Sequence, residues 1–225
     1  MNDNREKINQ VENIDTQSRI YMLRFMLDIP NLMTLTGLCC GMLSIYFTSL
    51  HEYSTAMISL LWAAFFDWFD GPVAKIIKGR NKDFMTFGGQ LDSIADLVSC
   101  GVAPAFILLT IGNFDSAYIP GALFLVCSGA IRLSYFNVYG LKEDGTYSGV
   151  PIGINIILIT LVFLLQGTIN TEYFQWLLYC VILIGGALNI APIPFMKLTG
   201  VWYVAIACFV FLLTMFYVWR ISFLG

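Results

Sequence analysis

Long apolar runs separated by short polar breaks dominate this sequence, and they restrict what it can fold into. A helix that crosses the hydrocarbon core of a bilayer needs about 20 apolar residues. The runs cover residues 30–50, 53–76, 88–111, 117–138, 150–167, 173–191 and 199–220. The final 34 residues also suit two short helices or one tilted helix, so the chain has room for six to eight spans. The sequence therefore predicts an all-α, polytopic membrane helix bundle.

The composition excludes several other classes of protein. Hydrophobic residues make up 58% of the chain and charged residues 12%, with a mean hydropathy of +0.74. Soluble domains are about 45–50% apolar and about 25% charged, so a soluble enzyme and a disordered chain are excluded. A net charge of −3 offers no basic surface to nucleic acid. His51 is the only histidine and the six cysteines form no Cys-x-x-Cys pair, so a multi-His or zinc-type site is not expected.

The first 28 residues differ from the rest of the chain. Residues 1–18 are polar, so we do not expect a cleavable signal peptide. Residues 19–29 place apolar side chains at helical spacing beside two arginines, which is typical of an amphipathic helix lying in the membrane interface. The alternative is an extension of the first span. We therefore expect a polar segment at 1–28, with this interfacial helix, followed by one transmembrane catalytic domain at 29–225.

Lysine and arginine residues predict the orientation of the spans. They gather in the N-terminal segment and in the connections near residues 80, 143 and 195, and the first, third and fifth connections have none. Arg220, near the end of the last run, is the one basic residue that does not fit this alternation. Because basic connections stay on the cytoplasmic side, we expect the N-terminus and these three connections to be cytoplasmic, in a cytoplasmic (inner) membrane.

Four carboxylates within the predicted spans are the main functional signal, since charged residues are costly there. Asp67 and Asp70 are three residues apart, and Asp92 and Asp96 are four apart, so each pair shares one face of a helix. The two spans are joined by a short connection and are expected to be antiparallel neighbours. All four carboxylates then meet near the cytoplasmic headgroup level.

Such a crowded set of carboxylates needs cations between its members. Oxygen ligands suit Mg²⁺, Mn²⁺ or Ca²⁺, and two such ions about 3.5–4 Å apart would polarise a diphosphate. The alternative is a group of interfacial aspartates that cap helix ends. Gly71 and Gly88 lie beside the aspartates, where small residues allow a ligand or another helix to approach closely.

The segment around these aspartates resembles the signature of the CDP-alcohol phosphatidyltransferases. That family reads Asp-x-x-Asp-Gly-x-x-Ala-Arg, then eight or nine residues, then Gly-x-x-x-Asp-x-x-x-Asp. This chain reads DWFDGPVAK at 67–75 and GGQLDSIAD at 88–96. Two departures stand out: Lys75 replaces the arginine, which loses its planar fork, and the gap at 76–87 is 12 residues long.

Further stretches resemble the bacterial phosphatidylserine synthases of that family. They are IPNLMTLTGLCCG at 29–41, LDSIADLVSCGVAP at 91–104, SGAIRLSYFN at 128–137 and SGVPI at 148–152. The resemblance implies a six-helix membrane core, here with about one extra C-terminal span, and usually a homodimer. It implies transfer of a phosphatidyl group from CDP-diacylglycerol to an alcohol, with release of CMP and use of divalent metal.

We expect L-serine to be the acceptor in this chain. Glycerol 3-phosphate or inositol phosphate would be acceptors for the same chemistry, although a phosphorylated acceptor needs an anion site of its own. An ion-coupled transporter is an alternative of another class, but transporter carboxylates usually lie near the midplane. Membrane lipids are the expected surroundings, and no nucleic-acid partner is expected.

The resemblance and the positions of polar residues assign roles to individual side chains. The metal ligands are Asp67, Asp70, Asp92 and Asp96. The CDP-lipid site comprises Asn31, Thr34, Asp67, Gly71, Ala74, Lys75 and Gly88. The acceptor site comprises Arg132, a charge within the fourth span, and Asn137, one turn further on.

Asp96 is also the candidate general base, because His51 lies at the opposite end of the spans and Cys100 lies deeper. Alternatives remain open for several residues: Asp96 as a ligand only, Arg132 as a partner of an aspartate, and Asn31 and Thr34 as helix caps. No role is assigned to Asn155 or Asn189.

Overall fold

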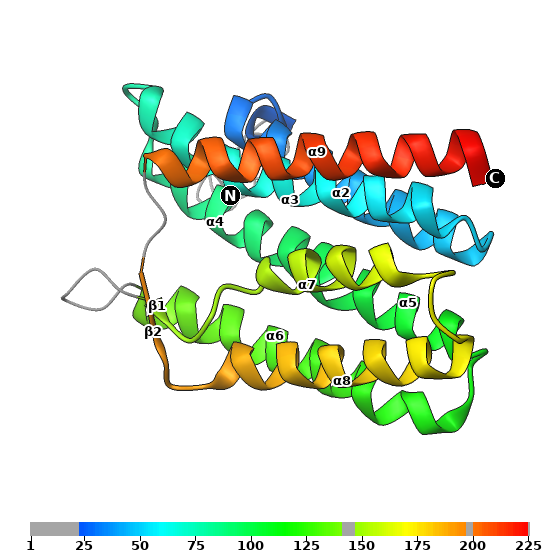
Figure 1. Cartoon of the computed structure of the whole chain (residues 1–225). Helices are drawn as coiled ribbons and strands as arrows, with labels where there is room; N and C mark the ends of the chain where they lie inside the picture. Colours follow the sequence, from blue (N-terminus) through cyan, green and yellow to red (C-terminus); the bar gives the residue numbers. More distant parts are fainter. Residues whose placement is uncertain (1–22, 141–146, 197–199, 225) are drawn as a thin grey trace, which may run out of the picture.

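A computed structural model describes residues 23–140, 147–196 and 200–224, which form a bundle of roughly parallel helices (Figure 1). The helices are α2 (Ile29–Ser49), α3 (Tyr53–Ile76), α4 (Lys82–Asp96), the π-helix η1 (Leu97–Val102), α5 (Ala103–Ile111), the 3₁₀ helix η2 (Ser116–Tyr118), α6 (Ile119–Tyr139), α7 (Ile154–Val162), the 3₁₀ helix η3 (Phe163–Leu165), α8 (Thr171–Ile190) and α9 (Val201–Leu224). Two short strands, β1 (Tyr147–Ser148) and β2 (Pro194–Phe195), pair antiparallel.

The described helices confirm a polytopic helical membrane protein. Five of them are long and apolar enough to cross a bilayer. These are Ile29–Ser49, Lys82–Ile111, Ser116–Tyr139, Thr171–Ile190 and Val201–Phe223. α3, which was also predicted to span the membrane, is not among these five; its 24 residues include the first two aspartates and Lys75. α9 is one continuous helix rather than two short ones. The helix at Ile154–Leu165 is shorter than its predicted run; at 1.5 Å per residue it spans about 18 Å.

Some predictions concern residues outside the described part of the chain. Residues 1–22 include the first four positions of the interfacial helix predicted at 19–29, and several of the basic residues used for orientation. The connections at 141–146 and 197–199 include Lys142 and Lys197. The described chain begins with a helical stretch at 23–26, directly before α2.

Local signals explain where several helices begin. Pro30 lies in the first turn of α2, where a missing N–H costs nothing. Asn170 caps α8 by accepting a hydrogen bond from the Glu172 amide at 2.9 Å. The turn between α2 and α3 passes through His51, which has a φ of +62°. This tight turn makes α2 and α3 an antiparallel hairpin.

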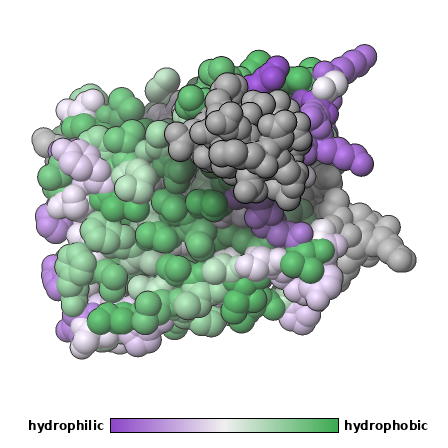
Figure 2. Space-filling view, turned by 180° about the vertical axis from the view of Figure 1, so that it is seen from behind, coloured by the Kyte–Doolittle hydropathy of each residue, from purple (hydrophilic) through white to green (hydrophobic). Residues whose placement is uncertain are grey.

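α2 lies against both α3 and α4, the two helices that carry the aspartates. α2 packs against α3, α4 and η1, while α9 lies along the outer side of α3 (Figure 1). α6 and α8 pack together at the opposite edge, and α7 lies between the two groups. The apolar core is fully buried where α3, α5, α6 and α7 meet, at residues such as Leu60, Ile107, Leu125 and Ile156. The face shown in Figure 2 carries a wide apolar band, with polar residues gathered towards its two ends.

A buried amide network fixes the π-helix that follows the last aspartate. The Asn155 side-chain amide of α7 donates to the carbonyl of Cys100 in η1 at 3.3 Å and to Asn189 of α8 at 3.5 Å. Asn189 in turn donates to the Ser128 hydroxyl of α6 at 3.3 Å. Polar groups inside a membrane bundle must be satisfied by one another. This network gives both asparagines a structural role that the sequence left open.

Candidate active site

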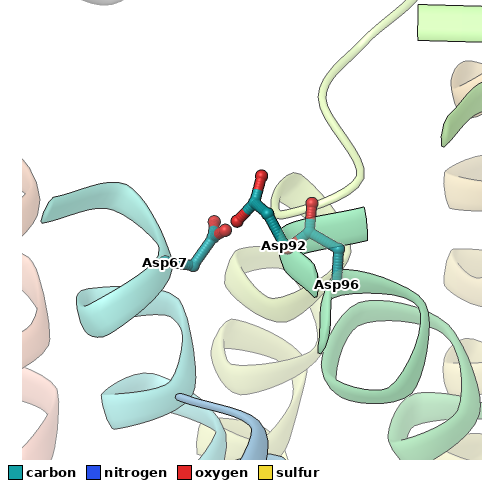
Figure 3. Close-up of side chains that lie close together, drawn as sticks. All are labelled: Asp67, Asp92 and Asp96. Atoms are coloured by element: carbon teal, nitrogen blue, oxygen red, sulfur yellow. The ribbon is translucent and has the colours of Figure 1, made fainter. Parts of the chain in front are cut away.

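Three carboxylates face one another across the gap between α3 and α4. One oxygen from each of Asp67, Asp92 and Asp96 lies within 4.8 Å of the other two, and all three residues are half-buried. Asp67 comes from α3, whereas Asp92 and Asp96 lie one turn apart on α4 (Figure 3). α2 packs along both helices and so sets the distance between them.

The fourth predicted aspartate takes a different position. Asp70 is buried and accepts a hydrogen bond from the Thr34 hydroxyl of α2 at 2.5 Å. Among the described residues, the cluster of three carboxylates therefore excludes Asp70. Asp92 lies near both the cluster and Asp70, because it belongs to the cluster and also lines a cavity together with Asp70.

The cluster fits a divalent cation. Asp92 Oδ1 is buried and has no hydrogen-bond partner among the described residues. Burying an unsatisfied oxygen of this kind is costly, and a cation between the carboxylates would both satisfy it and offset their repulsion. Oxygen donors of this number suit Mg²⁺, Mn²⁺ or Ca²⁺ rather than zinc. The site can therefore hold metal.

A cavity of about 330 Å³ opens beside the cluster and contains the residues predicted to bind the acceptor. Asp67, Asp92 and Asp96 lie on one side of it, and Arg132 and Asn137 of α6 line it as well. Arg132 is buried and donates from Nε to the Val150 carbonyl at 2.8 Å, which fixes its side chain. Asn137 is tied to α4 by a hydrogen bond of 2.9 Å from its amide to the Ser93 hydroxyl.

A second cavity, of about 190 Å³, also has Asp92 in its wall. It is lined by most of the residues predicted to bind the CDP-lipid: Asn31, Thr34, Gly71, Ala74 and Gly88. The other two, Asp67 and Lys75, line the larger cavity instead. Gly71 lines both cavities, so the two spaces meet beside the carboxylates.

The two predicted glycines serve different purposes. A Cβ added to Gly71 would meet no atom within 4 Å, so this glycine leaves open space where the two cavities join. A Cβ on Gly88 would lie 2.6 Å from Asn31 Oδ1. Gly88 therefore allows α4 to approach α2 closely, which is the packing alternative considered from the sequence.

Sequence reasoning missed several residues that line these cavities. Arg80, in the connection between α3 and α4, lines the smaller cavity. Ser93 of α4 and Tyr203 of α9 line the larger one. A lone arginine in the unusually long 76–87 stretch was a signal that could have pointed to Arg80. Tyr203 had no comparable signal, because it is one of many aromatic residues in an apolar run.

Replacing Asp92 by asparagine should weaken metal binding, because the substitution removes a charged ligand shared by both cavities. We expect Mn²⁺ affinity to fall at least about tenfold, measured by isothermal titration calorimetry on the purified chain in detergent. Asp83→Asn is the matched control, since Asp83 is exposed in the first turn of the same helix. Equal Mn²⁺ binding by Asp92→Asn and the unmodified chain would contradict the metal site.

Comparison with known proteins shows which family the chain belongs to. The sequence model of the CDP-alcohol phosphatidyltransferase family matches residues 27–188. Similar proteins named CDP-diacylglycerol–serine O-phosphatidyltransferase include those of Helicobacter pylori strain J99 (34% identical over 140 residues, 61% of this chain and 57% of the relative) and Methanocaldococcus jannaschii (33% over 142 residues, 62% of each). The Bacillus subtilis protein of that name is 33% identical over 128 residues, 55% of this chain and 68% of the relative.

These alignments leave a large part of the relatives uncovered. The chain spans a little over half the length of the Helicobacter pylori relative, at 57%, and 40% of a Mycobacterium tuberculosis relative. The family match, in contrast, includes all four aspartates and both cavities except for the residues contributed by α9. The chain therefore belongs to the CDP-alcohol phosphatidyltransferase family.

Proposed function

We propose that this protein transfers a phosphatidyl group from CDP-diacylglycerol to L-serine, which gives phosphatidylserine and CMP. The observation that carries the proposal is the position of the three-carboxylate cluster where two cavities meet. One cavity collects most of the residues expected to bind the CDP-lipid, and the other collects those expected to bind the acceptor. The names of the similar proteins support serine as that acceptor.

The four aspartates are the residues proposed to bind the metal ions of this reaction. We infer that Asp67, Asp70, Asp92 and Asp96 hold two divalent cations, Mg²⁺ or Mn²⁺, with Ca²⁺ as a further ion of suitable chemistry. Bound there, the cations would neutralise the diphosphate and stabilise the charge that develops on departing CMP. The half-buried setting of the carboxylates strengthens these interactions relative to water.

The displacement takes place where the cavities meet. The serine hydroxyl oxygen forms a bond to the phosphorus that carries diacylglycerol, and the bond from that phosphorus to the CMP oxygen breaks. A carboxylate oxygen of Asp96 accepts the hydroxyl proton. Positioning the two substrates in the two cavities that share Asp92 supplies a large part of the acceleration, because a bimolecular step then proceeds within one complex.

Two other functions are less well supported. A phosphorylated acceptor, such as glycerol 3-phosphate or inositol phosphate, needs a second anion site. Among the described residues that line the larger cavity, the cations are Arg132 and Lys75, and Lys75 is exposed. An ion-coupled transporter is disfavoured because residues 27–188 match the CDP-alcohol phosphatidyltransferase family.

A direct assay tests the proposed activity. The purified chain is incubated with CDP-diacylglycerol, Mn²⁺ or Mg²⁺, and a panel of labelled alcohols, and we expect label from serine to enter lipid with release of CMP. Because the cluster needs cations, EDTA should remove nearly all turnover. Turnover that persists in EDTA would contradict the metal-dependent reaction, and label from another alcohol would replace serine as the acceptor.

Arg132→Lys should separate the two substrates. The guanidinium donates from Nε to the Val150 carbonyl and presents its N–H groups in a planar fork that matches a carboxylate, a geometry that a single ammonium group cannot reproduce. We expect the KM for serine to rise about tenfold or more, a loss typical of one charge-assisted hydrogen bond. The KM for CDP-diacylglycerol should change less than threefold. The opposite pattern would assign Arg132 to the lipid phosphate.

Asp96→Asn should uncouple turnover from binding. If Asp96 is the general base, kcat should fall by roughly 10²–10⁴, while CDP-diacylglycerol in the presence of Mn²⁺ binds within a few-fold of the unmodified affinity. Equilibrium binding and steady-state kinetics on the same preparation provide the comparison. If binding collapses together with turnover, Asp96 is primarily a metal ligand and the base lies elsewhere.

We further propose that the aspartates face the cytoplasm and that the chain acts as a homodimer in the cytoplasmic membrane. The basic residues of the connection between α3 and α4, at the aspartate end of the bundle, support this orientation; the dimer rests on the family resemblance. A cysteine at Asn81, which is exposed, should react with an impermeant thiol reagent only in inside-out vesicles when the native cysteines are replaced. Labelling from the other side would reverse the orientation.

A further inference from the structure

The connection between α3 and α4 sends one side chain inward. Lys78, Gly79 and Asn81 are exposed, whereas the Arg80 side chain between them is only 10% exposed. Gly79 has a φ of +81°, a left-handed conformation that glycine adopts without strain and that turns the chain at this point. Arg80 thereby reaches the wall of the smaller cavity.

The Arg80 guanidinium is anchored at one of its nitrogens. Nη2 forms an ion pair with Asp28, directly before α2, and lies 3.4 Å from Asn31 Oδ1. Nε is buried and has no hydrogen-bond partner among the described residues. A buried donor without an acceptor is unfavourable, so the guanidinium is poised for an acceptor that enters the cavity.

The charges of this cavity indicate what kind of acceptor fits. Asp70 and Asp92 line the same cavity as the arginine, so a phosphate bound there would lie close to a cation and to carboxylates proposed to hold metal. A guanidinium presents its N–H groups in a planar fork that matches phosphate oxygens. The family pattern has an arginine where this chain has Lys75, and Lys75 is exposed and lines the other cavity.

We propose that Arg80 binds the phosphate of the CMP half of CDP-diacylglycerol in the smaller cavity, donating its Nε–H to a phosphate oxygen. This role rests on the proposed function and adds a binding residue from the long 76–87 connection. Asp28 and Asn31 hold the guanidinium in place while Nε binds the ligand. The contrasting interpretation is that Arg80 only pins the segment before α2 through Asp28.

Binding of CMP tests this role without any turnover. Isothermal titration calorimetry of CMP into the full chain, in detergent with saturating Mn²⁺, is run on the unmodified protein and on Arg80→Gln, Asp28→Asn and the double variant. We expect Arg80→Gln to weaken CMP binding about tenfold or more, both alone and in the Asp28→Asn background. Lys78→Gln, an exposed cation two residues away, is the matched control and should bind within twofold of the unmodified chain.

Steady-state kinetics provide a second measurement, which separates weaker substrate binding from damage to the fold. Arg80→Gln should raise the KM for CDP-diacylglycerol about tenfold, leave the KM for serine unchanged and keep kcat at saturation within about threefold. Arg80→Lys should recover part of the CMP affinity, because it restores the charge without the fork. A folded but nonspecifically damaged protein would lose kcat instead.

Three outcomes would overturn the role of Arg80. They are unchanged CMP affinity in Arg80→Gln, an equal loss in Arg80→Gln, Asp28→Asn and the double variant, and a loss of kcat without a change in the KM for CDP-diacylglycerol. The second outcome would show that the ion pair acts only as a structural link. Failure of the proposed function looks different, because the unmodified chain would then bind no CMP in the presence of Mn²⁺.

Discussion

The repulsion among Asp67, Asp92 and Asp96 is the interaction around which the rest of this bundle is organised. Their oxygens lie within 4.8 Å of one another in a protein made almost entirely of apolar helices. At that distance two unit charges repel by roughly 3 kcal/mol, even at an effective dielectric constant near 20. Divalent cations between the carboxylates would offset this repulsion, and the arrangement needs a scaffold stiff enough to keep the carboxylates in place.

That stiffness comes from contacts behind the carboxylates. α2 packs along both aspartate-bearing helices, and Thr34 holds Asp70 by a hydrogen bond of 2.5 Å. The π-helix that follows Asp96 is fixed by Asn155, which bonds to the Cys100 carbonyl. A π-helix leaves the backbone ladder irregular, and irregular backbone inside a membrane needs such partners. The apolar surroundings thus support the charged site through a few buried polar bonds.

The division of the site into two cavities would let one carboxylate cluster serve the two unlike substrates of the proposed reaction. Asp92 and Gly71 line both spaces, so a ligand in either one lies next to the same carboxylates. The smaller cavity is bounded by α2, α3, α4 and their connection. The larger one shares α3 and α4 with it and also takes residues from α6 and α9, so the proposed acceptor site has wall elements that the proposed nucleotide site lacks. α9 lies beyond the family match at 27–188, so that match does not include this part of the wall.

The sequence by itself determined the helical membrane fold, the family and the choice of the four aspartates as candidate ligands. The lengths of apolar runs and the spacing of residues are local properties, so they can be read directly from the sequence. It could not reveal that Asp70 turns to Thr34 while Asp92 faces both cavities, since the rotation of α3 against α4 is set by their packing on α2. Nor could it place Arg80, which reaches the site only because the chain turns at Gly79. The roles of Asn155 and Tyr203 were likewise decided by tertiary structure, because each depends on helices far apart in the sequence meeting at one point.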